Sequence, residues 1–377
     1  EKMPAPKDSN VLVKLVWRIL GGLNFALLFA CMFFIGNILP FISKIVVKPL
    51  FPGLHEQLKS TMADILFKDI TDWAEVVGGL QVLECGDKIP VGSCILISNH
   101  VSYTDSIAIH TIARRRNEIG HVRPFAKRTL AYVPIFGWFG VFINYIFLSR
   151  SWDKDRNMIR RQLHELVRKA KLYSTGNFWL MLFPEGTRMR PKKLAEAQAF
   201  AKKRDLPVLD NLLVPRLKGF VSAMDGTREA IDGVIDITIG YSHFTKSGHA
   251  RPSVGDMMFS HGNEWEVHTH IKYHPIKTLP TGEEAEGKWL QERWVEKDKL
   301  LAAFHKDGHF PGDYHLTLFN ERSAVDAGQN GVTMIILAVT MYFVCARLFS
   351  SAYAQDWSGL AALAKSNIEA LLLPAAK

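Results

Sequence analysis

The sequence predicts an α/β protein with a mixed sheet, crossover helices, and membrane-associated N-terminal and C-terminal helices on either side of it. Three observations support this class. In the middle of the chain, short apolar runs rich in β-branched and aromatic residues alternate with amphipathic helical stretches. An uncharged apolar stretch lies near the N-terminus, and another lies near the C-terminus. The middle of the chain is therefore expected to supply the sheet, and the two ends the membrane-associated helices.

The composition fits a large folded protein. The chain has 377 residues, of which 48% are hydrophobic, and this excludes a disordered chain. Cys31, Cys85, Cys94 and Cys345 are widely spaced, so neither a disulfide scaffold nor a structural zinc site is expected. The net charge of +9 suits an anionic partner, which can be nucleic acid, anionic lipid or a phosphorylated substrate.

The N-terminal apolar stretch is long enough to cross a bilayer. No charged residue occurs from Ile19 to Ser43, and cations stand on both sides of the stretch. Pro40 disfavours a straight span, so one alternative is a helix that enters one leaflet, turns near Pro40 and continues as an interfacial helix from Phe41. A buried helix of a soluble protein is a third interpretation.

Two further apolar segments follow the central part of the chain. Residues 331–346 are uncharged and too apolar for a loop, and residues 359–373 have apolar positions at helical spacing. We therefore predict a membrane-associated helical region at 1–70, an α/β domain at 71–313 and a second membrane-associated helical region at 314–377.

The central domain is predicted to alternate strands with helices. A buried strand is expected at 94–100 (CILISNH), a helix at 104–116 (TDSIAIHTIARRR) and a second strand at 145–150 (YIFLSR). An amphipathic helix then follows at 153–170 (DKDRNMIRRQLHELVRKA), and another strand begins the segment 178–187 (FWLMLFPEGT). Such alternation is typical of strands that join one sheet through crossover helices.

The first polar cluster follows the first of these strands. His100 comes directly after an apolar strand, and Asp105 stands five positions later, where the next helix begins. One turn of backbone can bring the carboxylate to the imidazole, where it fixes the tautomer and raises the basicity of the ring. A general base is one interpretation, and a helix-capping Asp105 beside a loop histidine is the other. Ser102 and Ser106 are candidate nucleophiles, but no GxSxG sequence surrounds either of them.

Two basic clusters follow later in the chain. Gly186 permits a tight turn, Thr187 offers a hydroxyl, and Arg188 presents a guanidinium fork suited to a phosphate or carboxylate. Arg216 and Lys218 alternate on a segment that is predicted to be extended. Taken alone, the first cluster also fits an ordinary loop, and the second also fits a solvated edge strand.

Taken in order, these motifs resemble those of the glycerophospholipid acyltransferase family. They are NHVSYTD, then PIFGWFGVFINYIFLSR with Arg150, then FPEGTR and VPRLKG, and together they cover residues 94–219. The resemblance extends to the 1-acylglycerol-3-phosphate and lysocardiolipin acyltransferases through residues 149–156, 205–209 and 289–312. The first 50 residues and the C-terminal region do not align with the family.

The resemblance implies transfer of a fatty acyl group from acyl-CoA to the free hydroxyl of a lysophospholipid such as lysophosphatidic acid. His100 would act as general base with help from Asp105, without an acyl-enzyme. The residues that would hold the acceptor phosphate or shape its pocket are Lys127, Arg150, Glu185, Gly186, Thr187, Arg188 and Arg216. No metal is expected, and no cofactor other than acyl-CoA as co-substrate.

The same resemblance implies a membrane location with membrane lipid as a partner. The endoplasmic reticulum is the expected compartment, and the mitochondrial membrane is the alternative. Two other function classes stay open: a hydrolase that uses the same residues on lipid esters, and a structural subunit of a larger membrane complex that keeps an acyltransferase fold. Nucleic acid is not expected as a partner, because the basic residues have no aromatic stacking platform and no zinc-finger spacing.

Two conspicuous clusters are predicted to be structural. Nine of the 14 histidines lie between His243 and His315. Within 265–274, however, polar and apolar residues alternate, which indicates one buried and one wet face of a strand rather than a metal site. The basic run at 114–116 is predicted to be a solvated helix end or a lipid-facing patch.

Overall fold

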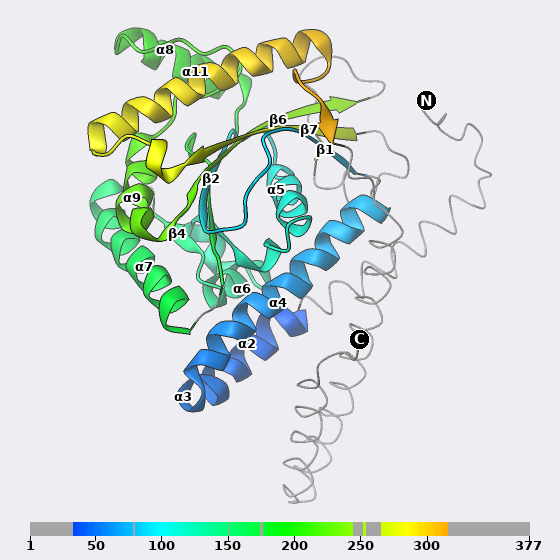
Figure 1. The fold of residues 1–377 in the computed structure, drawn as a ribbon, viewed down its shortest axis with the longest axis vertical. Coiled ribbons are helices and arrows are strands. Elements are labelled where there is room, and N and C mark those ends of the chain that lie inside the picture. Colours follow the sequence, from blue (N-terminus) through cyan, green and yellow to red (C-terminus); the bar gives the residue numbers. More distant parts are fainter. Residues whose placement is uncertain are drawn as a thin grey trace, which may run out of the picture. The chain divides into compact units, whose positions relative to one another are not determined.

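Figure 1 shows the computed structural model, which describes residues 33–77, 80–149, 151–173, 176–243, 252–253 and 265–315. The chain divides into two compact units, Glu1–Ser323 and Ala324–Lys377, and every described residue belongs to the first. The predicted apolar segment at 331–346 and the predicted helix at 359–373 lie outside the described residues.

An eight-stranded mixed sheet forms the centre of the described part of the chain. Its strand order is β4-β3-β5-β2-β6-β7-β1-β8. The strands are β1 (Gln81–Gly86), β2 (Cys94–Ser98), β3 (Val122–Lys127), β4 (Ile146–Leu148), β5 (Trp179–Leu182), β6 (Gly233–His243), β7 (Trp265–Pro275) and β8 (Tyr314–His315). Neighbours from β4 to β6 are parallel, β7 pairs antiparallel with β6 and parallel with β1, and β8 is antiparallel to β1. The predicted α/β class and mixed sheet are therefore confirmed.

Helices cover both faces of the sheet (Figure 1). They are α2 (Leu39–Ile42), α3 (Lys48–Leu50), α4 (Pro52–Asp72), α5 (Asp105–Arg114), α6 (Phe136–Phe142), α7 (Trp152–Tyr173), α8 (Pro191–Lys203), α9 (Leu217–Thr227) and α11 (Glu283–Asp307). One core lies between the sheet and α5, with α4 beside it, and the other lies between the sheet and α7, α9 and α11. Within β2, Ile95 and Ile97 enter one core while Cys94 and Leu96 enter the other, so the strand is apolar throughout.

Several helices begin and end with residue types that favour the start or the end of a helix. Asp153 and Asp155 lie in the first turn of α7, where negative charge suits the helix dipole, and Lys171 lies in its last turn. α8 begins with Pro191, at a position where no amide hydrogen is needed. α11 ends at Gly308, whose φ of 77° is a left-handed conformation that glycine adopts without strain.

The N-terminal helix does not turn at Pro40. The backbone is helical from Phe34 to Leu50, with π-helical segments before and after Pro40, and the break comes at Phe51 (φ −137°, ψ 72°). The wider π-helical turns accommodate a residue that cannot donate a backbone hydrogen bond. The alternative in which the helix turns near Pro40 is therefore wrong. Within the described ranges no helix is both long and apolar enough to cross a bilayer, and residues 19–32 of the apolar stretch fall outside those ranges.

The basic run at 114–116 is neither a solvated helix end nor a lipid-facing patch. Its guanidinium groups are partly buried and pair with carboxylates of α4, the turn after it and β1: Arg114 with Asp72 and Glu75, Arg115 with Glu75 and Glu84, and Arg116 with Glu84. These ion pairs tie α5 to its neighbours. The prediction failed because the acidic partners lie far away in the sequence, and the basic run alone contains no sign of them.

The strand predicted at 265–274 is β7, but its second face is only partly wet, because Lys272 is exposed while His268 is buried. His268 is 5% exposed, and its ring lies 5.2 Å from that of Phe304 on α11, measured between centroids. This helix covers part of the face that alternation alone predicts to be solvated. In the part of the chain that the structure describes, no group of three or more His, Cys, Asp or Glu side chains is placed to hold a metal ion.

Candidate active site

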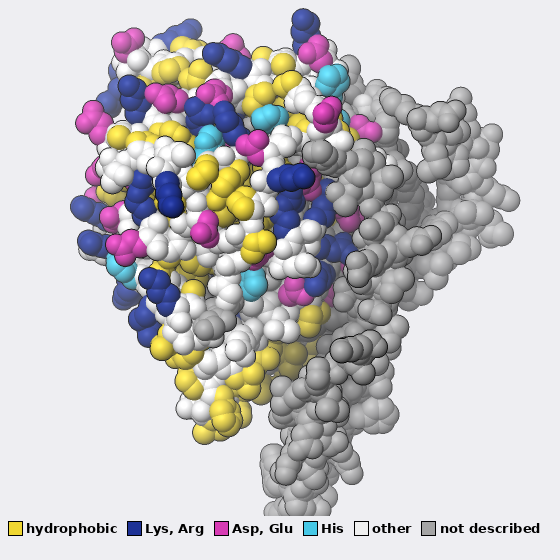
Figure 2. Space-filling view, in the orientation of Figure 1, with side chains coloured by type: hydrophobic (Ala, Val, Ile, Leu, Met, Phe, Trp, Pro, Cys, Tyr) yellow, Lys and Arg dark blue, Asp and Glu magenta, His cyan; other side chains and the backbone are white. Residues whose placement is uncertain are grey.

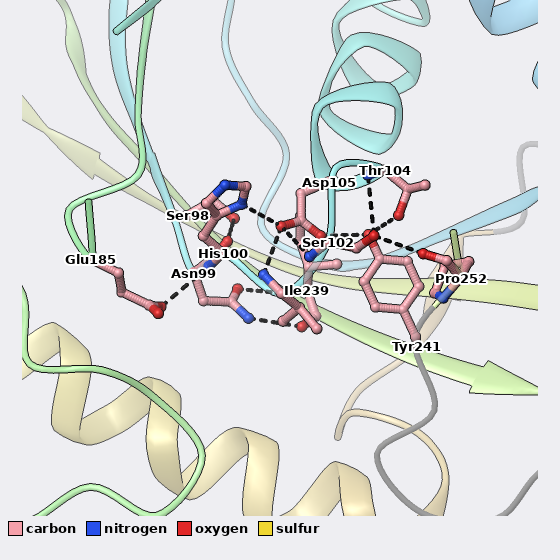
Figure 3. A network of polar contacts seen from close by, with 11 residues as sticks. Ser98, Asn99, His100, Ser102, Thr104, Asp105, Glu185, Ile239, Tyr241 and Pro252 are labelled. Carbon is pink, nitrogen blue, oxygen red and sulfur yellow. Dashed lines mark hydrogen bonds and ion pairs between the residues drawn. The ribbon is translucent and has the colours of Figure 1, made fainter. Parts of the chain in front are cut away.

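A histidine and an aspartate meet at the carboxyl end of β2. The strand ends at Ser98, His100 lies in the following loop, and Asp105 is the first residue of α5. Nδ1 of His100 lies 2.8 Å from Oδ2 of Asp105 (Figure 3). With the proton on Nδ1, the imidazole leaves Nε2 unprotonated and able to accept a proton. The contact expected from the sequence spacing is thus present.

Three further donors hold the carboxylate of Asp105 in place. Its Oδ2 accepts the backbone N–H groups of Val101 (2.7 Å) and Ser102 (3.0 Å), and its Oδ1 accepts the hydroxyl of Tyr241 (2.5 Å). Burial and the charge of Asp105 raise the pKa of Tyr241 well above its ordinary value, so the hydroxyl stays a donor. The fully buried carboxylate therefore keeps one orientation toward His100.

The ring of His100 is also held by an aromatic contact. It stacks on Phe183, with the ring centroids 4.2 Å apart and the planes 23° from parallel. The carbonyl of His100 accepts the N–H of Met189 at 2.8 Å. The loop that contains FPEGTR therefore packs directly against the loop that contains NHVSYTD, and together they fix the position of the imidazole.

A cavity of about 890 Å³ lies beside His100. It forms where the carboxyl ends of β3, β4 and β5 meet that of β2, and residues of α4, α5, α7 and α9 complete its walls. This edge of a parallel sheet is the usual place for a ligand in open α/β folds. The predicted site residues that line the cavity are His100, Lys127, Gly186, Thr187, Arg188 and Arg216. The fold therefore brings residues from well-separated motifs to one space.

Of the other predicted site residues that the structure describes, Asp105 and Glu185 do not line the cavity. Asp105 lies behind His100, and Arg150 lies outside the described residues. Glu185 is 2% exposed, and its Oε1 accepts the backbone N–H of His100 at 3.2 Å (Figure 3). Burial raises the pKa of Glu185 well above its ordinary value, because it penalises the charged form of the carboxyl group. Glu185 therefore joins the two loops from behind the cavity.

Gly186 and Arg216 pack against each other. Gly186 has a φ of 67°, and a Cβ atom there would lie 3.0 Å from Cδ and Nε of Arg216. The N–H of Arg216 donates to the carbonyl of Pro184 at 2.8 Å. Glycine at position 186 thus sets the place of this cation. Lys218 does not continue an extended segment as expected, because α9 begins at Leu217 and only Arg216 keeps extended backbone (φ −88°, ψ 104°).

The cations of the cavity have no carboxylate partner within the described part of the chain. The guanidinium carbon of Arg188 lies 3.4 Å from the ring centroid of Tyr103, which is 60% exposed. Stacking on the ring face leaves the N–H groups at the edge of the guanidinium able to bind a ligand. Among the described residues, Lys127, Arg188 and Arg216 form no ion pair. The cavity therefore keeps positive charge that a ligand can neutralise.

Three residues that build the site were given no role from the sequence. Asn99 exchanges two hydrogen bonds with the backbone of Ile239, at 2.9 and 2.8 Å, and so joins the end of β2 to β6. Tyr103 supports Arg188, and Tyr241 supports Asp105. Asn99 and Tyr103 lie within NHVSYTD, where their position in the motif was an available signal. Tyr241 lies on a distant strand, and no local pattern marks it.

Comparison with known proteins gives the family. The Acyltransferase family model matches residues 83–242, and the model for the Acyltransferase C-terminus matches residues 258–339. A 1-acyl-sn-glycerol-3-phosphate acyltransferase 3 of Arabidopsis thaliana is 31% identical over 273 residues, which are 71% of this chain and 70% of the relative. The chain belongs to the glycerophospholipid acyltransferase family. The resemblance stated from the sequence motifs is thereby confirmed.

Other relatives of this glycerophospholipid acyltransferase have similar names. The 1-acyl-sn-glycerol-3-phosphate acyltransferase 2 of Arabidopsis thaliana is 28% identical over 86% of this chain and 80% of its own. The human 1-acyl-sn-glycerol-3-phosphate acyltransferase gamma is 29% identical over 58% of this chain and 55% of its own. The crystal structure of the 1-acyl-sn-glycerophosphate (LPA) acyltransferase PlsC of Thermotoga maritima covers 77% of this chain and 99% of its own, with a TM-score of 0.43 and 16% identity. At that level the likeness carries no argument about the site.

Tyr241→Phe is expected to lower the kcat of this acyltransferase about tenfold while the fold stays intact. The variant removes one hydrogen bond to a charged carboxylate, and such bonds contribute about 1.5–3 kcal/mol. Steady-state acyl transfer by the purified variant measures the loss. Tyr145→Phe is the matched control, because Tyr145 lines the cavity but does not contact Asp105. Equal losses in the two variants would show that the hydroxyl of Tyr241 does not act through Asp105.

Proposed function

We propose that this acyltransferase moves a fatty acyl group from acyl-CoA to the free hydroxyl of a lysophospholipid such as lysophosphatidic acid. One observation carries the proposal: His100, held from behind by Asp105, lines the same largely apolar cavity as a set of cations that form no ion pair with any described residue. The cavity offers a base, positive charge for a phosphate and space for acyl chains. The names of the relatives, which are 1-acyl-sn-glycerol-3-phosphate acyltransferases, support the same acceptor.

In the proposed reaction, His100 acts as the general base. Its Nε2 takes the proton of the acceptor hydroxyl as the oxygen attacks the thioester carbonyl, and Asp105 stabilises the imidazolium that forms. The tetrahedral intermediate then collapses, the C–S bond breaks, and the imidazolium returns its proton to the departing thiolate of CoA. The products are one ester and one free thiol. Since a thioester is already activated, positioning of the two substrates suffices and no acyl-enzyme is required.

The cations of the cavity suit the phosphate of the acceptor. Arg188 presents a planar fork that stacks on Tyr103, Arg216 is positioned by Gly186, and Lys127 adds a compact charge at the end of β3. Together they can offset the charge of a phosphate monoester. Arg150 is proposed as a further member of this set on the family resemblance alone.

The apolar walls of the cavity suit acyl chains on both sides of the sheet edge. Phe67, Ile70 and Ile107 line it on the side of α4 and α5, and Leu148, Ile159 and Phe220 line it on the side of α7 and α9. Each side therefore has its own apolar surface. We assign one side to the acyl chain being transferred and the other to the chain that the acceptor already carries.

Exposed apolar side chains support a membrane location. They gather on the N-terminal helices, on α6 and on the segment before it: Phe41, Ile45, Val46, Leu50, Phe51, Leu130, Tyr132, Phe136 and Trp138. Figure 2 shows hydrophobic side chains at the lower end of the described part of the chain, which α2 and α3 form. Gly36 packs against Phe139, so the first helix and α6 are neighbours. We propose that this surface contacts the membrane that supplies the lipid substrate, in the endoplasmic reticulum or in mitochondria.

Product analysis distinguishes this function from the two alternatives. With acyl-CoA and lysophosphatidic acid, we expect CoA and diacyl product in equal amounts, and no product from phospholipid alone. A hydrolase would release free fatty acid from phospholipid alone. A structural subunit would transfer no acyl group to any lysophospholipid.

Arg188→Lys tests the phosphate site. Lysine keeps the charge but loses the fork and the flat stacking on Tyr103, so we expect the KM for lysophosphatidic acid to rise about tenfold. The KM for acyl-CoA should stay nearly unchanged. Arg190→Lys is the matched control, because Arg190 is exposed, lies two positions away and does not line the cavity. A rise in both KM values would instead give Arg188 a folding or acyl-CoA role.

A further inference from the structure

A second cavity lies beside the edge strand of the sheet. Its volume is about 670 Å³, and its lining comes from α6, the turn after it, β4 and α7. Within the described residues β4 is the last strand at this side of the sheet. The lining residues of the two cavities have Tyr145 in common and no other. This cavity is therefore a separate space from the one that contains His100.

The α7 wall of the second cavity carries positive charge. Arg161, His164, Arg168 and Lys169 line it together with Glu165. Both carboxylate oxygens of Glu165 accept N–H groups of Arg168 at 2.8 Å, which helps to lower the pKa of Glu165 to about 2. Arg161, in contrast, has no ion pair or hydrogen bond with any described residue. Arg161 is therefore a cation of this wall that remains available to an anion.

A buried amide lies next to this cation. Gln162, the next residue along α7, also lines the cavity, and its Oε1 atom is buried without a hydrogen-bond partner among the described residues. Rotation of the amide exchanges its oxygen for an NH2 group, which donates two hydrogen bonds. The guanidinium group of Arg161 can by itself present several N–H donors to the oxygens of one phosphate.

The opposite wall of the cavity is apolar and continues onto the surface of α6. Val141, Ile146 and Phe147 line the cavity. Val141 is 53% exposed, and Trp138, three positions earlier on the same side of α6, is 52% exposed. A ligand that suits both walls has an anionic head and an apolar tail.

We propose that the second cavity binds the phosphate head group of an anionic phospholipid, with the acyl chains on the apolar surface of α6. The location agrees with this ligand. Figure 2 shows Lys and Arg side chains over α7, beside the hydrophobic end formed by α2 and α3. The site is distinct from the acceptor phosphate site, because Lys127, Arg188 and Arg216 do not line it.

Vesicle binding by two neighbouring charge variants tests the proposal. The full chain is mixed with phosphatidylcholine vesicles, with or without phosphatidylglycerol, and bound protein is measured by flotation. Arg161→Gln and Arg160→Gln make the same change in charge on the same helix, and both positions are exposed, but Arg160 does not line the cavity. We expect the phosphatidylglycerol-dependent binding to fall about tenfold in Arg161→Gln, which corresponds to the lower end of the range for loss of one charge-assisted hydrogen bond. In Arg160→Gln we expect it to fall less than about threefold.

Two outcomes of these experiments would overturn the proposal. Equal losses in both variants would mean that vesicle binding depends only on the overall charge of the protein and not on the cavity. Soluble glycerol phosphate and dihexanoyl phosphatidylglycerol can each be added to compete with the vesicles for the protein. If the two compete equally strongly, the cavity binds free phosphate rather than a lipid. Because no acyl substrate is present, these results are independent of whether the protein transfers acyl groups.

Discussion

His100→Ala is expected to lower the kcat for acyl transfer by about 10² to 10⁴, the usual contribution of a positioned general base. The imidazole is the group that would take the proton of the acceptor hydroxyl, and alanine leaves no base at that place. The side chain is 18% exposed, so its removal should leave the fold unchanged. Steady-state kinetics and circular dichroism of the purified variant measure both expectations.

His121→Ala is the matched control for this variant. His121 is also paired with a carboxylate, since its Nδ1 lies 2.9 Å from Glu118, and it is 24% exposed, but it does not line the cavity. We expect its kcat to stay within about twofold of the wild type. Near wild-type turnover in His100→Ala would show that His100 is not the base.

Asp105→Asn is expected to lower kcat about 10³-fold, with the KM for lysophosphatidic acid within about twofold of the wild type. An amide has no charge with which to stabilise the imidazolium. With its NH2 group in the place of Oδ2, the amide would also face the Nδ1–H of His100 and the backbone N–H donors of Val101 and Ser102. The pH dependence of kcat/KM, which reports the ionisation of the free enzyme, should change together with the rate.

Asp155→Asn is the control for loss of a buried carboxylate, because Asp155 lines the cavity that contains His100. Asp155 is 5% exposed, and its Oδ1 accepts the N–H and hydroxyl of Ser149, without contact to His100. We expect a far smaller effect on kcat than in Asp105→Asn. If Asp105→Asn keeps both the rate and the pH profile, Asp105 is a helix cap and nothing more.

The sequence predicts those features of the site whose signals are local. His100 and Asp105 lie five residues apart across the junction of a strand and a helix, so one turn of backbone decides their contact. Arg188 follows a strand that is parallel to β2, and carboxyl ends of parallel strands meet at one edge. Local spacing and sheet direction are therefore enough to bring these groups together.

Features that depend on distant partners could not be predicted in this way. Lys297, within the aligned segment 289–312, is fully buried; its Nζ donates to the carbonyl of Ile237 at 2.6 Å and pairs with Asp236. Asp298 accepts the backbone N–H of Asn211 at 2.7 Å. Tyr241 likewise acts on a residue of another element. Each of these contacts joins elements whose proximity only the tertiary fold creates.

The predicted domain boundaries at 1–70, 71–313 and 314–377, the roles of the site residues and the membrane-associated ends of the chain stay predictions. Residues 1–32 and 316–377 lie outside the described part, so nothing in the structure bears on them.

The most direct measurement of the central claim is acyl-CoA-dependent transfer by the purified protein to lysophosphatidic acid and to monoacylglycerol with the same acyl chain. The two acceptors differ by the phosphate that Arg188, Arg216 and Lys127 are proposed to hold. We predict a kcat/KM at least about 100-fold higher for lysophosphatidic acid, since each charge-assisted hydrogen bond to the phosphate contributes about 1.5–3 kcal/mol. Equal transfer to both acceptors, or release of CoA without any acceptor, would contradict the account.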